Sequence, residues 1–486
     1  MRNNPANFAA VAQEELKKTE QLNHLSKIAS AVSATGSTRL REYGDERQQA
    51  EARTNGGRIR SASINALAAL LEQFEAKATQ NGIKVLWADD GVEACDLIGQ
   101  IVEKHQVKLI TKGKSMIGEE IEINHFLTEK YGTEIYEGDL GELIVQQRGG
   151  MPFHIVGPAM NLTLPEIAQT LSEKIAMPYS EEIPAMVGYV RRFMRGKFQG
   201  SQMGITGVNQ AVAATGSLLL VENEGNIRWV TSAPRIHVAL MSIEKVCANM
   251  SDAFYLLGLL TRSCTGQAMT SYLSVLNGPR RAEEEDGPDE LYVVIIDNNR
   301  SAAYQNEQYK EAMRCIRCGR CGFQCPIYMT VGSTPYGWCY PGPMGTVLAP
   351  LVLGPDATRD LYEACTLCGG CQSVCPTRVP HVDLLLSYRA ENQKRHGSVV
   401  ERMGYKVWAK GVESPALYQK GLKLVRNYLI GKSRDGVITK LPKAANPWLT
   451  VRDFPAPEAK SFREKWRESL GAELAKNHAQ ASPKEE

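Results

Sequence analysis

Short apolar runs alternate with helical patterns along residues 61–300. The runs that are typical of strands are residues 84–88, 107–111, 133–136, 153–156 and 291–296. Residues 64–74, 94–101, 121–130 and 141–147 instead repeat apolar positions at the spacing of an amphipathic helix. Short apolar strands that alternate with helices usually pair in parallel, with helices covering both faces of the sheet. The pattern therefore predicts one α/β domain with a largely parallel sheet over residues 61–300.

One part of this region has a different pattern. Residues 217–221 (SLLLV) are followed by polar turn residues at 223–226 and by a second apolar run at 227–230. Two apolar runs joined by a short polar turn that contains glycine are typical of antiparallel strands. We therefore expect a β-hairpin over residues 217–230.

Both ends of the chain are more polar. Residues 1–60 include the charge-dense segment 39–53, and we expect a helical arm that is either solvated or used for docking. Residues 391–486 carry 19 Lys and Arg against 11 Asp and Glu. Aromatic residues are interleaved with these charges at Trp408, Tyr428, Trp448 and Trp466. Nucleic-acid-binding proteins can have such interleaving, but we expect a basic docking region for a partner subunit, with a solvated tail as the alternative.

Eight of the twelve cysteines form two copies of one spacing, C-x2-C-x2-C-x3-C-P. The first copy comprises Cys315, Cys318, Cys321 and Cys325, and the second comprises Cys365, Cys368, Cys371 and Cys375. This is the run with which bacterial ferredoxins hold 4Fe-4S clusters. Three thiolates two residues apart can surround three corners of one cluster, and glycines within the run let the backbone turn tightly.

The fourth cysteine of each run ligates the other cluster in two-cluster ferredoxins. By that rule one cluster is held by Cys315, Cys318, Cys321 and Cys375, and the other by Cys365, Cys368, Cys371 and Cys325. Disulfides would need an oxidising compartment, whereas the polar residues 1–18 lack the apolar core of an export signal. Zinc sites usually pair two C-x2-C knuckles or use histidines. The predicted cofactors are therefore two 4Fe-4S clusters.

The remaining cysteines stand alone in the sequence. Cys95, Cys247 and Cys264 are expected to be small packing residues. Cys339 lies in a loop rich in proline and glycine; we expect it not to be a ligand, and its role stays open. His381, six residues after Cys375, is expected at the surface, with tuning of a cluster as the alternative.

Composition excludes several classes of protein. Of the 486 residues, 43% are hydrophobic and 23% charged, which is ordinary for a globular protein and argues against disorder. The net charge of +2 produces no strong field for a nucleic acid. No apolar run approaches the roughly 18 residues of a membrane span. We therefore expect a cytoplasmic protein without nucleic acid or a transmembrane segment; peripheral membrane association stays open.

These features together resemble the lactate utilization iron–sulfur protein B family, in which a LUD domain precedes a two-cluster ferredoxin module. Besides the two cysteine runs, the likeness lies in residues 111–124 (TKGKSMIGEEIEIN), 138–146, 204–227, 234–245 and 337–345 (GWCYPGPMG). The resemblance implies an isomerase/CoA-transferase-like α/β fold for the LUD domain. It also implies a complex that oxidises L-lactate to pyruvate, with a cysteine-rich subunit and a second LUD-domain subunit as partners.

The expected order of domains follows from the patterns and the resemblance together. The 39 residues between the cysteine runs exceed the gap of compact bacterial ferredoxins, and the flanking segments look helical. We therefore expect an α-helical type of two-cluster domain. The expected parts are a helical N-terminal arm (1–60), a LUD α/β domain (61–300), a two-cluster ferredoxin-like domain (306–390) and a basic docking region (391–486).

Polar residues in the family-like segments are candidates for a binding pocket. Lys112 and Ser115 precede a predicted helix, where backbone N–H groups can hold an anion. Glu142, His154 and His237 are further candidates. Together they suggest a pocket for a metabolite that carries a carboxylate. The alternative is that these side chains only cap helices or satisfy backbone groups.

Electron counting narrows the expected role. Oxidising a 2-hydroxy acid removes two electrons, whereas each cluster ordinarily passes one. A G-x-G-x-x-G motif after a strand would indicate a nicotinamide or flavin nucleotide, but Gly200, Gly204 and Gly207 do not have this spacing. We therefore expect a subunit that relays single electrons rather than the catalyst alone. Two alternatives stay open: a catalytic 2-hydroxy-acid oxidoreductase with substrate in the LUD domain, and a non-enzymatic redox-sensing or scaffold protein.

Overall fold

The computed structural model describes residues 5–18, 27, 44–441, 449, 452–471 and 473–474. The chain divides into two units, the first ending at Lys394 and the second beginning at Arg395. Much of the predicted N-terminal arm lies outside the described residues, as does Trp448 of the C-terminal aromatic set.

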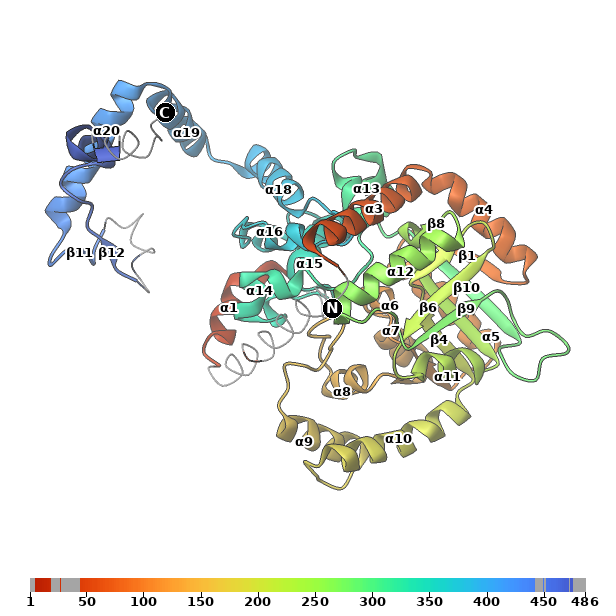
Figure 1. The fold of residues 1–486 in the computed structure, drawn as a ribbon. Coiled ribbons are helices and arrows are strands. Elements are labelled where there is room, and N and C mark those ends of the chain that lie inside the picture. Colours follow the sequence, from red (N-terminus) through yellow and green to blue (C-terminus); the bar gives the residue numbers. More distant parts are fainter. Residues whose placement is uncertain are drawn as a thin grey trace, which may run out of the picture. The chain divides into compact units, whose positions relative to one another are not determined.

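A six-stranded parallel sheet forms the centre of the α/β region of the first unit (Figure 1). In spatial order its strands are β1 (Lys84–Ala88), β10 (Glu290–Ile296), β7 (Ile236–Ser242), β4 (Met203–Gly207), β2 (Leu109–Lys112) and β3 (Glu134–Glu137). The predicted largely parallel sheet is therefore confirmed. Two of its central strands, β4 and β7, are not among the apolar runs from which the sheet was inferred.

Both faces of this sheet are buried, because successive side chains of its central strands enter different hydrophobic clusters. In β10, Val293 packs with α4 (Leu67–Gln80) on one face. The next residue, Val294, packs on the other face with α5 (Gly91–Lys104) and α7 (Ile123–Tyr131). Continuous burial on two sides explains why the strand reads as an apolar run rather than an alternating one.

A second, four-stranded sheet packs on the α4 side of the first. Its strands are β8 (Val246–Cys247), β5 (Gln210–Val212), β6 (Ser217–Glu222) and β9 (Tyr272–Leu276). Helix α12 (Met250–Thr265) covers it through Ala253 and Leu257, which pack against Cys247. Cys247 and Cys95 are buried, as expected of small packing residues.

The hairpin predicted over residues 217–230 is wrong in its second half. After β6 the chain forms α11 (Asn226–Ser232) instead of a returning strand. The carboxylate of Glu222 accepts the N–H groups of Ile227 (2.6 Å) and Arg228 (3.3 Å) and so caps the start of this helix. Asparagine and glycine favour hairpin turns and helix starts alike, so the turn residues did not distinguish the two.

The strand predicted at residues 153–156 is also wrong. The Phe153 N–H donates to the carbonyl of Pro158 (2.8 Å), and the Val156 N–H donates to His154 Nδ1 (3.1 Å). These bonds turn the segment back on itself, so it adds no strand to the sheet.

The remaining helices of the α/β region lie around the two sheets. They are α6 (Met116–Glu120), α8 (Leu140–Arg148), α9 (Leu164–Ile175), α10 (Ile183–Gly200) and α13 (Arg300–Gln305). Helix α3 (Glu46–Asn65) runs beside α12 and the 3-10 segment Tyr309–Arg314, which leads into the first cysteine run (Figure 1). The helical pattern at residues 64–74 is thus divided between α3 and α4.

The cysteine-containing segment is helical, as predicted. Its helices are α14 (Pro326–Val331), α15 (Gly342–Val352), α16 (Arg359–Glu363), α17 (Gly370–Ser373) and α18 (His381–His396). Its aromatic core includes Tyr309 and Tyr362, which both stack on Tyr388. A parallel α/β region followed by this segment agrees with the predicted fold class.

The second unit begins with two longer helices, α19 (Val399–Glu413) and α20 (Pro415–Lys432), and neither contains a buried residue. They are followed by the strand pair β11 (Val437–Ile438) and β12 (Phe454–Pro455) and by α21 (Phe462–Lys465). No helix among the described residues is both long and apolar enough to cross a bilayer.

Candidate iron–sulfur centre and adjoining cavities

The cysteines of the two runs line two cavities, and both runs contribute to each cavity. The first cavity is lined by Cys315, Cys318, Cys321 and Cys375. The second cavity is lined by Cys325, Cys365, Cys368 and Cys371. Each cavity thus receives three cysteines from one run and the last cysteine from the other, which is the grouping that the ferredoxin rule gives. That these cysteines are ligands stays a prediction.

The two cysteine loops have matching backbone geometry. Two positions after the first cysteine, Arg317 and Leu367 adopt positive φ values of 61° and 55°. The backbone N–H of each donates to the sulfur of that first cysteine, at 3.3 Å in both loops. The glycines after the second cysteines, Gly319 and Gly369, also have positive φ, 73° and 76°. The turns therefore point backbone dipoles towards sulfur, which suits a negatively charged thiolate.

Backbone N–H groups elsewhere in the segment also reach the sulfurs. The Val379 N–H donates to Cys375 Sγ at 3.3 Å, and a backbone hydrogen bond from Met344 reaches Cys321. This donor set fits an iron–sulfur cluster, whose potential depends on hydrogen bonds to sulfur. The described residues contain no group of three or more His, Cys, Asp or Glu arranged around a single metal ion. Cluster ligands are instead spread around a core of four irons.

Two buried histidines line the first cavity. His154 Nδ1 accepts the Val156 N–H, so its proton is on Nε2, which donates to the Gly319 carbonyl at 3.0 Å. His381 Nδ1 donates to the Val379 carbonyl at 2.9 Å, and its Nε2 has no hydrogen-bond partner among the described residues. The expected surface position of His381 is therefore wrong. Burial lowers the pKa of each histidine to about 4.

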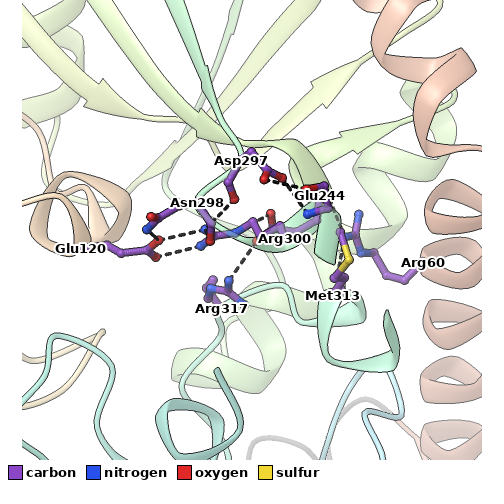
Figure 2. Close-up of polar contacts among 9 residues, drawn as sticks. Arg60, Glu120, Glu244, Asp297, Asn298, Arg300, Met313 and Arg317 are labelled. Carbon is purple, nitrogen blue, oxygen red and sulfur yellow. Dashed lines mark hydrogen bonds and ion pairs between the residues drawn. The ribbon is translucent and has the colours of Figure 1, made fainter. Parts of the chain in front are cut away.

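A chain of buried charges connects the α/β region to the first cysteine run (Figure 2). Arg300 donates two hydrogen bonds of 2.8 Å to Glu120 and lies 3.0 Å from Glu244. Arg317 pairs with the same Glu244 at 2.9 Å. Arg60, from α3, donates to the Glu244 carbonyl at 2.5 Å. Burial alone would raise the pKa of Glu244, but the two guanidinium groups lower it to about 2.

The second cavity has different surroundings. No charged side chain lines it in the described part of the chain, where its wall is built from residues such as Tyr336, Leu361 and Leu385. One of its cysteines, Cys368, is exposed. Arg389 lies outside this wall and donates to the Tyr362 carbonyl at 2.9 Å.

A third cavity, of about 210 Å³, lies at the carboxyl ends of β2, β4 and β7, and we call it the sheet-edge cavity. From the α/β region it is lined by Lys114, Ser115, Asn209, Lys245 and Cys264, among others. Arg317 and Tyr340 of the cysteine segment complete its wall. Burial, together with nearby Arg317, lowers the pKa of Lys245 to about 8.

A fourth cavity, of about 330 Å³, is acidic. It is lined by Glu119, Glu122, Glu129, Glu137, Glu142 and Cys339, among others. Burial raises the pKa of Glu142 to about 8. Cys339 is buried here and lines neither of the cysteine cavities, and its non-ligand role stays a prediction.

The five candidate pocket residues do not come together in one cavity. Ser115 lines the sheet-edge cavity, Glu142 the acidic cavity and His154 the first cysteine cavity. Lys112 is fully buried, and its ammonium group lies between Glu119 (2.8 Å) and Glu137 (2.6 Å). Neither Lys112 nor His237 lines any of these cavities. His237 bonds Thr206 at 2.7 Å in the sheet, and burial lowers its pKa to about 3.

Sequence reasoning missed the charged residues between the cavities. Arg317 and Lys245 were not singled out, although Arg317 stands between two cysteines of the first run and Lys245 closes a family-like segment. A cation inside a cysteine run was the available signal for Arg317. Glu120 and Glu244 lie in family-like segments, but their pairing with Arg300 leaves no local signal, because only the fold brings these residues together.

Family models match three consecutive parts of the chain. A LUD domain matches residues 71–296, a 4Fe-4S dicluster domain matches residues 311–379, and the C-terminal region of lactate utilisation protein B matches residues 388–470. The dicluster domain contains both cysteine runs and supports the predicted pair of clusters as cofactors.

Relatives of similar length match almost the whole chain. Lactate utilization protein B of Bacillus cytotoxicus is 38% identical over 91% of this chain and 93% of that protein. The proteins of the same name from Bacillus thuringiensis and Bacillus anthracis are 36% identical with the same coverage. A crystal structure of a DUF162 family protein from Deinococcus radiodurans covers 47% of this chain and 98% of its own, at 12% identity and a TM-score of 0.28. The identity to the Bacillus proteins along the chain shows that it belongs to the lactate utilization protein B family.

Proposed function

We propose that this chain is the electron-transfer subunit of a multi-protein complex that oxidises L-lactate to pyruvate. The observation that carries the proposal is the pair of cavities that each collect four cysteines from two separate runs. Bound there, two 4Fe-4S clusters would each accept and pass one electron at a time. The family relationship supports a role in lactate utilization.

The proposed ligands follow the two cavities. Cys315, Cys318, Cys321 and Cys375 hold one cluster, and Cys365, Cys368, Cys371 and Cys325 hold the other. Because each cluster takes its fourth sulfur from the other run, ligation ties the two runs into one folded unit. The N–H groups of Arg317, Leu367 and Val379 donate to three of these sulfurs and help to set the potentials.

The two-electron step is assigned to other subunits. The proposed partners are a cysteine-rich subunit and a second LUD-domain subunit, and the exposed apolar residues of α19 and α20 offer a surface for one of them. We place the complex in the cytoplasm, where reduced thiols favour cluster ligation over disulfides.

Purification without oxygen tests the proposal. The isolated chain should contain about eight irons, and dithionite should reduce its clusters to a state visible by electron paramagnetic resonance (EPR). L-Lactate should produce that signal only when the partner subunits are present. Failure of lactate to reduce the clusters in the assembled complex would overturn the proposal.

Cysteine variants test the exchange of the fourth ligand. Cys375→Ser should remove or alter the cluster of the first run, and Cys325→Ser that of the second, with the other EPR signal retained. Cys95→Ala, which removes a buried cysteine away from both cavities, should keep about eight irons. If Cys375→Ser instead altered only the cluster of its own run, the exchange of ligands would be wrong.

A further inference from the structure

We propose that the sheet-edge cavity binds a small carboxylate such as a 2-hydroxy or 2-oxo acid, with Lys245 as its main counter-charge. This binding site would add to the proposed electron-transfer role. It rests on that role only in one respect: a cluster in the neighbouring first cysteine cavity would respond to the ligand. Binding itself requires no cluster and no redox step.

The position of the cavity in the sheet is the first argument. In the spatial order of strands, β2 lies beside β4. The next strand of this sheet after β2 is β3, which lies beside β2 at the sheet edge. The next strand after β4 is β7, which lies beside β4 in the other direction along the sheet. The two connections diverge at this point, and the cavity is lined by residues that follow both strands, Ser115 and Asn209. Open α/β sheets bind ligands at the carboxyl ends of their strands where connections diverge in this way.

The second argument is an unpaired cation. Lys245 lines the cavity, and its ammonium group makes no hydrogen bond or ion pair with any residue in the described part of the chain. Of the other cations in the wall, Arg317 pairs closely with Glu244 at 2.9 Å, and Lys114 lies 3.7 Å from Glu142. Lys245 is half-buried, and partial removal of an unpaired charge from water is unfavourable, so an anion beside Lys245 would stabilise it.

The carboxylates in the same wall do not fill this role. Asp139 accepts the backbone N–H of Glu142 at 3.0 Å and caps α8. Glu222 accepts two N–H groups at the start of α11, and Glu224 accepts the N–H of Asn223 at 3.2 Å. Glu222 also lies 3.7 Å from Arg228. None of the three acids forms an ion pair with Lys245 in the described part of the chain, so Lys245 is left as a charge that a ligand can neutralise.

The size and polar lining of the cavity restrict the ligand. A volume of about 210 Å³ suits a few-carbon acid and is small for a dinucleotide. Asn209 Oδ1 accepts the Val221 N–H at 2.9 Å. Its amide NH2 group has no partner among the described residues and can donate to a ligand oxygen. Leu240 and Leu260 add apolar surface for a short carbon chain. One unpaired cation, one amide donor and apolar surface match a small carboxylate with an oxygen substituent.

The cavity shares a wall with the first cysteine cavity. Arg317, Tyr340 and Ile155 line both. Arg317 also belongs to the buried chain of charges and pairs with Glu244 (Figure 2). An anion in the sheet-edge cavity would therefore act electrostatically on the residue that stands between two cysteines of the first run. Ligand binding should be detectable at the first cluster and absent from the second.

Calorimetric titration of the cluster-replete chain tests the proposal, with L-lactate, pyruvate and inorganic phosphate as separate probes. A carboxylate probe should bind. Lys245→Met should weaken its binding by roughly thirtyfold or more, because the bound carboxylate loses its counter-charge. Lys245→Arg should recover part of the affinity. Lys108→Met, an exposed lysine beside the opposite end of β2, should bind as the unchanged chain does.

The same samples separate this proposal from the electron-transfer role. Retention of about eight irons and of dithionite-reducible clusters in Lys245→Met, with loss of binding and of the ligand-induced EPR change, supports the carboxylate site. A cluster-replete chain that binds neither lactate nor pyruvate, or that prefers phosphate, overturns it and leaves the electron-transfer role intact. A chain without iron that still binds pyruvate through Lys245 supports the site and overturns the electron-transfer role.

Discussion

The two cysteine cavities have the same backbone geometry but opposite surroundings. The first cavity is lined by Arg317, His154 and His381 and adjoins buried ion pairs. The second has an apolar wall, and its Cys368 is exposed. At the equivalent position of the two loops stands Arg317 in one and Leu367 in the other. The duplicated run therefore specifies ligation, while the neighbouring elements give each site its own electrostatics and access to solvent.

This difference suggests with which neighbour each site exchanges electrons. A positive charge beside a cluster favours its reduced form, because reduction adds negative charge. The first site adjoins the α/β region and the sheet-edge cavity and has no exposed cysteine, whereas the second site presents Cys368 to the surface. We expect the second site to exchange electrons with a partner subunit and the first with the α/β side.

The largest expected effect comes from the buried charges beside the first cavity. Glu244→Gln should lower the free energy of unfolding by about 3–5 kcal/mol, because Arg300 and Arg317 would lose a buried partner. Arg389→Gln, beside the second site, should cost only about 1–2 kcal/mol, since that side chain mainly donates to backbone carbonyls. Urea unfolding of the anaerobic protein measures both. Equal costs would contradict the contrast between the sites.

An exchange of the equivalent loop residues tests the electrostatic difference directly. Arg317→Leu should make the potential of the first cluster more negative by on the order of 100 mV, the equivalent of about 2 kcal/mol for a unit charge roughly 8 Å away at an effective dielectric constant of about 20. Leu367→Arg should raise the potential of the second cluster by less, because that position is partly exposed and water screens the charge. Redox titration followed by EPR measures both shifts. Unchanged potentials in both variants would show that these loop residues do not set the difference.

Much of the sheet was predictable, but its centre was not. β1 and β10 are apolar runs next to periodic helices, and both are strands as predicted. β4 has the sequence MGITG, and its Gly204 lies so close to α11 that a Cβ there would be 1.9 Å from the Val230 carbonyl. Glycine is required by that close approach, yet it weakens the strand signal. Propensity alone could not identify a strand whose composition is dictated by a neighbouring helix.

The cysteines and the charged residues of the site also differ in how far the sequence alone could predict them. The grouping of the cysteines follows from spacing within two short runs, because each loop folds around its own three sulfurs. Lys245 and Arg317 are brought to one cavity by the packing of the first cysteine run on the α/β region, with Glu244 between them. Contacts between distant segments leave no periodic pattern, so this part of the site required the structure.

Exposure should make the second cluster the more labile of the two. Cys368 is exposed, whereas every cysteine of the first cavity is buried or half-buried. Under air or with an iron chelator, we expect iron to fall from about eight to about four per chain in a first phase, roughly tenfold faster than the second, because solvent access promotes cluster oxidation. EPR during the loss should show the first cluster surviving longer. A single phase in which both signals disappear together would contradict the difference in access.

The smallest expected effect is a pH dependence confined to the α/β side. Burial and nearby Arg317 lower the pKa of Lys245 to about 8, so the cavity loses its unpaired cation as the pH rises above that value. Carboxylate affinity should therefore be nearly constant below pH 7 and should fall by up to about tenfold per pH unit well above pH 8. In Arg317→Leu the repulsion is removed, and the decline should begin at higher pH. Calorimetry from pH 6 to 10 measures both curves, with the second cluster's potential as the internal control. A flat affinity profile would show that Lys245 does not hold the anion, whereas a parallel drift of the second cluster's potential would trace the effect to the whole protein.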